Sequence, residues 1–214
     1  SLLMAITMQE LAKLTRVCAS DELFACGLMA QIGSLALATI YPEKYSDLME
    51  KKTSDQSMVE LERQYLKTDH NELTAAMLLN FGVPKIFVES IYYHEIPDES
   101  GFSEGSRPFH IVNLLHLGRQ IADFGLAEEC QRNQRTSELI LLGGKIGLDT
   151  ESFGALIDQV MKEWQSWGRM LKISAAELLP PFQKMMNAAA PRPENETDAA
   201  PLRILLVEDD PSSL

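Results

Sequence analysis

Cysteine is scarce in this sequence. The 214 residues contain three cysteines, Cys18, Cys26 and Cys130, an odd number with no C-x-x-C spacing. This pattern argues against both a disulfide framework and a zinc ribbon. It favours a protein of the reducing cytoplasm.

Positive charge is also in short supply. Lys and Arg number 19 against 31 Asp and Glu, which gives a formal net charge of −12. An acidic surface repels nucleic-acid phosphates and anionic lipid headgroups. We therefore expect no nucleic-acid partner and no membrane partner.

Long uninterrupted apolar runs are absent, since none approaches the ~20 residues of a membrane helix. The stretch 23–41 comes closest, but Gln31 interrupts it and Pro42 ends it. Position 1 is a serine and not an initiator methionine. The first residues also lack the basic segment that opens a signal peptide. We expect the chain to be cut from a longer cytoplasmic protein.

Alternating β-branched residues are almost missing from residues 1–187, where apolar residues recur instead at helical spacing. This predicts an all-α region. Ser20 or Asp21 is expected to cap a helix that continues to Pro42, and Asp69 to form a capping box with Glu72. Further helices are predicted over 57–67, from 69 to a stop at Gly82, from Pro84 to about 94, and over 109–124, 137–146, 151–171 and 174–187. Glu60 to Arg63 is interpreted as a solvated helix face.

The composition changes sharply after Asn187. Residues 188–201 consist of small residues, prolines and acids, which predicts a solvated linker. Residues 202–207 are then nearly all apolar and are followed by three acids, the pattern of a buried parallel strand with polar groups at its carboxyl end. We expect a helical domain at 1–187, a linker at 188–201 and the start of an α/β domain at 202–214.

The C-terminal Leu-Arg-Ile-Leu-Leu-Val-Glu-Asp-Asp-Pro resembles the first strand and acidic corner of a response-regulator receiver domain. The resemblance implies that Glu208 and Asp209 belong to a Mg²⁺ site beside a phospho-accepting Asp, which would lie beyond residue 214. Carboxylate oxygens are the ligands that Mg²⁺ prefers. A plain buried strand with an acidic loop is the alternative.

Four further segments follow one another in the order and spacing of a single domain family: residues 23–33, 69–84, 91–95 and 111–116. Together they resemble the HDOD domain of the HD superfamily over most of residues 1–187, and residues 23–33 are similar to the superfamily's GLLHDIG segment. The resemblance implies an HD-like helical bundle in a bacterial signalling protein. HDOD domains usually have a further helical subdomain before the region that starts at Ser1, which also suggests a truncated chain.

The chemistry of an HD hydrolase needs an adjacent His-Asp pair to hold metal ions that activate water. Ala30 and Gln31 occupy these two positions, and alanine has no donor atom. We therefore expect no catalytic residues. His70, His94 and His116 remain at matched positions and form a candidate vestigial metal set. The alternative is that these histidines pack or hydrogen-bond locally.

The sequence thus predicts a signal-transduction regulator: a non-catalytic HDOD-like domain coupled to a phosphorylatable receiver domain in a phosphorelay. Mg²⁺ is the cofactor expected for the complete receiver, and none is assigned to the helical domain. The expected partners are a sensor kinase and a downstream effector, with a homodimer as one option. A metal-dependent phosphohydrolase or cyclic-dinucleotide phosphodiesterase, and a nucleotide sensor, are the alternatives.

Overall fold

The computed structural model describes residues 1–52, 56–172, 181–182 and 185–186. In this part of the chain all regular structure is helical and no strand occurs. The prediction of an all-α fold is confirmed for these residues. The predicted linker and the predicted receiver start lie outside them, as does most of the helix expected over 174–187.

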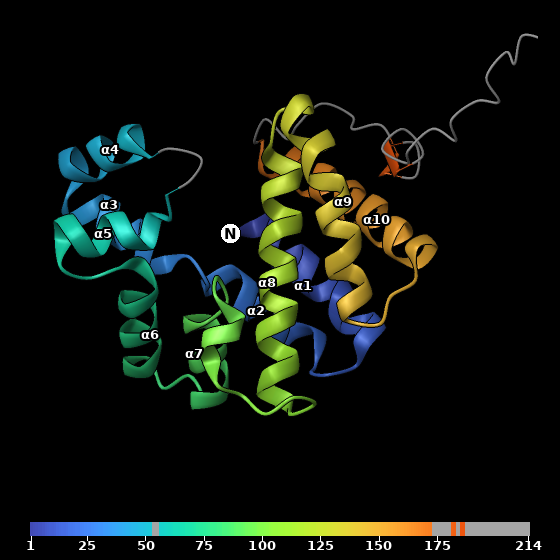
Figure 1. The fold of residues 1–214 in the computed structure, drawn as a ribbon, viewed down its shortest axis with the longest axis horizontal. Helices are drawn as coiled ribbons and strands as arrows, with labels where there is room; N and C mark the ends of the chain where they lie inside the picture. Colours follow the sequence, from blue (N-terminus) through green and yellow to red (C-terminus); the bar gives the residue numbers. More distant parts are fainter. Residues whose placement is uncertain (53–55, 173–180, 183–184, 187–214) are drawn as a thin grey trace, which may run out of the picture.

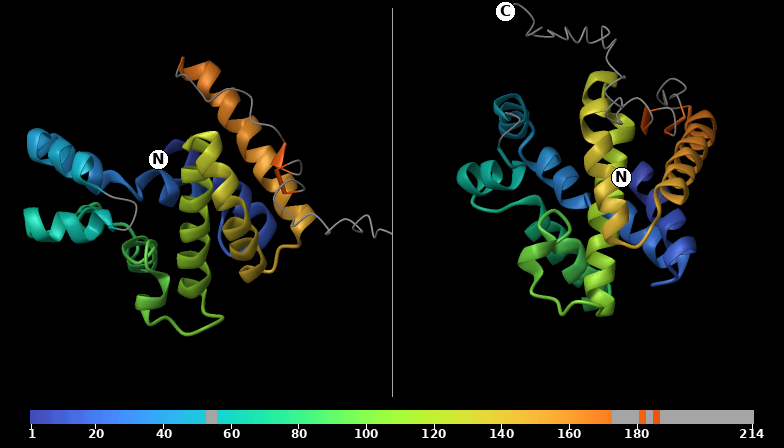
Figure 2. Two further views of the ribbon diagram at one scale, coloured as in Figure 1. Left: turned by 45° about the horizontal axis from the view of Figure 1, so that its top comes forward. Right: turned by 45° about the vertical axis from the view of Figure 1, so that its right-hand side comes forward.

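A long helix, α8 (Arg107–Leu126), runs through the centre of the molecule (Figure 1). On one side it packs against α1 (Leu2–Thr15) and α9 (Glu129–Lys145), and α1 also contacts α2 (Ser20–Met29) and α10 (Thr150–Leu171). Two rotated views in Figure 2 show the same grouping. These helices form the main body of the bundle.

A second group of helices extends from the other side of α8 (Figure 1). It contains α3 (Ile32–Ile40), α4 (Pro42–Lys51), α5 (Met58–Leu66) and α6 (His70–Asn80). The helix α3 packs along α6, α4 contacts α3 and α5, and α5 also contacts α6. The short α7 (Lys85–Tyr92) joins α6 to α8, and a 3-10 turn, η1 (Pro97–Ser100), precedes α8.

The hydrophobic core lies mainly in the first group. Residues 3–8 of α1 are all buried, because α2, α8 and α10 surround its first two turns. The sequence predicts an amphipathic helix here, but Leu14, at its end, is about half exposed. Burial on all sides is typical of a central helix rather than a surface helix.

Several helix boundaries differ from the prediction. The helix α9 begins at Glu129, eight residues before the predicted start at 137, and the N-cap of α2 is Ala19 rather than Ser20 or Asp21. The single helix expected from Ser20 to Pro42 is interrupted at Ala30 and Gln31, which separate α2 from α3. Pro42 does not simply follow a helix but opens α4, where its missing N–H is not needed. The break falls at the two positions that the resemblance aligns with the metal-binding pair of HD enzymes.

One stretch of the described residues, Ser20–Ile40, is long and apolar enough to cross a membrane, judged by length and composition alone. In the structure this stretch comprises α2, the turn and α3. Leu23, Cys26 and Leu37 are buried. Helices that pack into a protein core pass the same compositional test.

Candidate functional site

The site begins at the turn between α2 and α3. Ala30 is fully buried, and the side chain of Gln31 lines a cavity. Just after the turn, the Gly33 N–H donates a hydrogen bond to Thr74 Oγ1 of α6 at 3.0 Å. A Cβ atom at Gly33 would clash with the His70 carbonyl oxygen and lie 2.6 Å from Thr74 Oγ1. Only glycine therefore allows the turn to lie this close to the start of α6.

The start of α6 is fixed by its N-cap. As predicted, Asp69 caps the helix: its Oδ1 accepts a hydrogen bond from the Glu72 N–H at 2.8 Å. Its Oδ2 accepts from Arg63 Nε at 2.6 Å. The predicted capping box is only half formed, because Glu72 accepts from Thr68 Oγ1 instead of the N-cap N–H. The cap places His70 in the first turn, facing α5 and α7.

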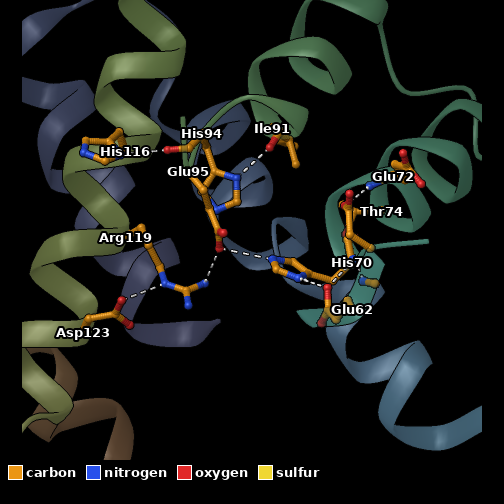
Figure 3. A network of polar contacts seen from close by, with 12 residues as sticks. Glu62, His70, Glu72, Thr74, Ile91, His94, Glu95, His116, Arg119 and Asp123 are labelled. Carbon is orange, nitrogen blue, oxygen red and sulfur yellow. Dashed lines mark hydrogen bonds and ion pairs between the residues drawn. The ribbon is translucent and has the colours of Figure 1, made fainter. Parts of the chain in front are cut away.

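Two carboxylates hold the buried His70 ring between them (Figure 3). Its Nδ1 lies 2.6 Å from Glu62 Oε2, and its Nε2 lies 3.1 Å from Glu95 Oε1. The His70 backbone N–H also donates to Glu62 Oε2 at 2.8 Å. Because an ionised carboxylate only accepts hydrogen bonds, both ring nitrogens must carry protons. His70 is therefore an imidazolium.

The electrostatics of His70 agree with this assignment. Burial by itself lowers the pKa of the ring, but the hydrogen bonds and negative charges of Glu62 and Glu95 outweigh burial and raise the pKa to about 9. For Glu95, burial favours a higher pKa, but the hydrogen bond and charge of His70 lower it to about 2. Both partners are charged around neutral pH.

The pair is part of a longer network of polar contacts from four helices and the turn that follows α7. Tyr45 of α4 donates to Glu62 Oε1 at 3.0 Å. At the other end, Glu95 lies 3.7 Å from Arg119 Nη1 of α8, and Arg119 Nε donates to Asp123 at 2.9 Å. Charges alternate in sign from Glu62 to Asp123 (Figure 3). These polar contacts connect the second group of helices to the central helix α8.

The other two histidines of the predicted metal set make local contacts. His94 is fully buried, and its Nδ1–H donates to the Ile91 carbonyl oxygen at 2.6 Å. Burial lowers the pKa of His94 to about 4, so this ring is neutral. His116 Nδ1–H donates to the His94 carbonyl oxygen at 2.9 Å. Both contacts match the alternative of local hydrogen bonding.

The donors present do not fit an HD-type metal centre. Ala30 offers no donor atom, and both nitrogens of His70 are protonated by their contacts with Glu62 and Glu95. Among the described residues, no group of three or more His, Cys, Asp or Glu side chains is arranged to hold a metal ion. Glu208 and Asp209, the predicted Mg²⁺ ligands of the receiver, lie outside the described residues.

A cavity of about 440 Å³ lies beside this chain of contacts. Side chains from α3, α4 and α8 form much of its wall, together with His70 and Glu95. The lining residues are Gln31, Ser34, Tyr45, Met49, Lys52, Ser57, Met58, His70, Glu95, His116, Arg119, Gln120 and Asp123. Its volume is within the range of small-molecule sites.

Sequence reasoning missed most of the charged partners. The interpretation of residues 60–63 as a solvated face is wrong for Glu62, which is fully buried. The available signal was its position three residues after the apolar Val59, which places both on one helix face. Arg119 and Asp123 follow His116 at three and seven residues, again on one face.

Comparisons with known proteins agree with this fold. The family model of the HDOD domain matches residues 1–97. A crystal structure of the MmoQ response regulator from Methylococcus capsulatus strain Bath is 29% identical, with a TM-score of 0.61 over 73% of this chain and 58% of that chain. A second crystal structure of that regulator is 28% identical, with a TM-score of 0.54 over 71% of this chain and 56% of that chain.

A third structure, of a candidate phosphohydrolase from Shewanella amazonensis SB2B, is 23% identical, with a TM-score of 0.57 over 75% of this chain and 56% of that chain. At this identity the likeness concerns the fold alone. No curated protein matches the chain. The chain spans under three fifths of the length of these solved structures. The prediction of an HDOD domain is confirmed over residues 1–97, within an HD-like helical fold.

Proposed function

We propose that this protein is a bacterial signal-transduction regulator that acts through protein–protein contact, with a non-catalytic HDOD domain. The observation that carries the proposal is the position of the His70 ring, which lies 2.6 Å from Glu62 and 3.1 Å from Glu95. Ala30 and Gln31 stand at the positions of the metal pair, and the histidine that remains nearby, His70, is held by ion pairs within the protein.

We further propose that a receiver domain follows the HDOD domain and that its phosphorylation changes how the helical domain engages a downstream effector. Glu208 and Asp209 would hold Mg²⁺ in that receiver, beside a phospho-acceptor supplied beyond residue 214. A sensor kinase would be the phosphoryl source. The likeness to a protein named as a response regulator supports this architecture. The proposed location is the cytoplasm, and a homodimer is one option for the assembly.

Metal content and turnover test the non-catalytic role. We expect protein purified without chelator or nickel to be folded, to contain far less than one metal ion per chain, and to hydrolyse neither phosphomonoesters nor cyclic dinucleotides when Mn²⁺ is added. The physical reason is the missing pair of anionic or imidazole ligands. Near-stoichiometric metal that is lost in His94→Ala or His116→Ala would favour the phosphohydrolase instead.

Phosphorylation of the full reading frame tests the receiver coupling. We expect acetyl phosphate and Mg²⁺ to modify one Asp downstream of Val207 and to change hydrogen exchange in the helical domain. Asp209→Asn in the same protein serves as the control and should abolish modification, because Mg²⁺ loses a carboxylate ligand. A reading frame without a receiver fold after Val207 would contradict the proposal.

A further inference from the structure

The central helix α8 presents an unusual polar face to the cavity. His116, Arg119, Gln120 and Asp123 follow one another at helical spacing and all line the hollow. The other sides of α8 carry buried apolar residues, among them Leu115, Leu117 and Ile121. The stripe faces a hollow of about 440 Å³, where a polar ligand can reach it.

Charged side chains form much of the described cavity wall. Lys52, His70 and Arg119 are the cationic lining residues, against the two carboxylates Glu95 and Asp123. Glu62 does not line the hollow, but it contacts the His70 ring at 2.6 Å, so the charge of His70 is already balanced. The attraction for an anion therefore rests on Arg119. Both lining carboxylates are already paired with cations.

The guanidinium of Arg119 has donors to spare. Its Nε donates to Asp123 at 2.9 Å, and its Nη1 lies 3.7 Å from Glu95, too far for a hydrogen bond. Within the described part of the chain, its two terminal nitrogens make no hydrogen bond of the usual length. The side chain is 25% exposed, so a molecule in the cavity can reach it. Planar guanidinium groups suit carboxylates and phosphates.

His116 adds a second, directional group one helical turn away. Its Nδ1–H is committed to the His94 carbonyl oxygen, which fixes the ring orientation and leaves Nε2 for other partners. A ligand hydroxyl can pair with Nε2 because a hydroxyl group both donates and accepts hydrogen bonds. A ligand with both an oxyanion and a hydroxyl group could therefore satisfy Arg119 and His116 together.

We propose that this cavity binds a small hydroxylated organic anion, either a carboxylate or a phosphate ester, with the oxyanion on Arg119 and a ligand hydroxyl hydrogen-bonded to His116 Nε2. This binding proposal rests on the proposed non-catalytic role, because the ligand is bound and not cleaved. Binding would act on the regulator directly, since Arg119 also contacts Glu95 in the chain of charges that joins the two groups of helices.

Side-chain NMR of the histidines tests the proposal. The chain has four histidines, and His110 is exposed and does not line the cavity, so it is an internal reference. We expect titration with glycerol 3-phosphate or malate, at constant ionic strength, to shift the ring signals of His116 saturably and to leave His110 unchanged. The two probes separate a phosphate ligand from a carboxylate ligand. No saturable shift with either at about 20 mM would overturn the proposal.

Matched variants locate the binding site. Arg119→Gln should weaken binding at least about tenfold, because a charge-assisted contact is lost. Arg135→Gln, on an exposed position of α9, should bind as the wild type does. His116→Gln is a second variant that keeps the ion pairs of Arg119, and it should also weaken binding. If Arg119→Gln and His116→Gln both bound the ligand as tightly as the wild type does, the proposed binding site would be wrong.

The same titration separates the two proposals. In the ³¹P spectrum glycerol 3-phosphate should remain intact. Binding without release of inorganic phosphate supports both the pocket and the non-catalytic role. Release of inorganic phosphate that is lost in Arg119→Gln would overturn the non-catalytic role while leaving the pocket in place. Absence of binding with an intact ester overturns only the pocket.

Discussion

Replacing His70 with alanine is expected to lower the free energy of unfolding by about 3–5 kcal/mol near pH 6. The variant removes the charged partner of Glu62, whose side chain is fully buried, and one of the two cations that contact Glu95. A buried carboxylate without its counterion is costly because burial removes it from water. Urea unfolding followed by circular dichroism measures the loss.

The pH dependence of this loss is a sharper test. The pKa of His70 is about 9 in the folded protein and close to 6.5 in the unfolded chain. The stabilisation from the ion pair is therefore fully present below about pH 6.5 and is lost as the pH rises through about 9. The difference in stability between wild type and His70→Ala should shrink as the pH rises to about 10.

An exposed histidine is the matched control for His70. His110→Ala should change the stability by less than about 0.5 kcal/mol, because the side chain is on the surface. If His70→Ala were as stable as His110→Ala, or if its effect did not vary between pH 6 and pH 10, the charged assignment of His70 would be wrong.

The second large effect is expected at Gly33. Gly33→Ala should destabilise the protein by about 3 kcal/mol, because a Cβ atom there meets the His70 carbonyl oxygen and the backbone and hydroxyl of Thr74. The obstacle is mostly backbone, so α3 must move away from α6. That movement also breaks the hydrogen bond from Gly33 to Thr74. Urea unfolding again gives the measurement.

Gly144 provides the matched control for this substitution. It lies within α9, and a Cβ atom added there would meet nothing within 4 Å. Gly144→Ala should therefore stabilise the protein by about 0.5–1 kcal/mol through helix propensity. A destabilisation of similar size in both variants would show that the close approach of α3 to α6 is not the cause.

Local signals predicted much of the fold. The Asp69 cap, the stop at Gly82, where φ is +77°, and the helix after Pro84 all depend on residues adjacent in sequence. The break at Ala30 and Gln31 could not be predicted in this way. The turn there depends on the approach of Gly33 to Thr74, 41 residues away, and no local pattern carries that information.

The same distinction applies to the site. His70, His94 and His116 could be selected because they match family positions, but their partners are set by the tertiary structure. Glu62 reaches His70 from α5, and Glu95 reaches it from the turn after α7. Acidic residues on predicted helices usually face solvent, so their burial became visible only after the helices were assembled.

The alternating charges from Glu62 to Asp123 also constrain how this sequence can drift between related organisms. Loss of any inner member leaves a neighbour with an uncompensated charge, so a lineage that changes one position must pass through an unstable intermediate. Inner positions are therefore expected to change in compensating pairs or not at all. Asp123, the partly exposed outer member, is free to vary alone. The inner members of this charge network would therefore be inherited together.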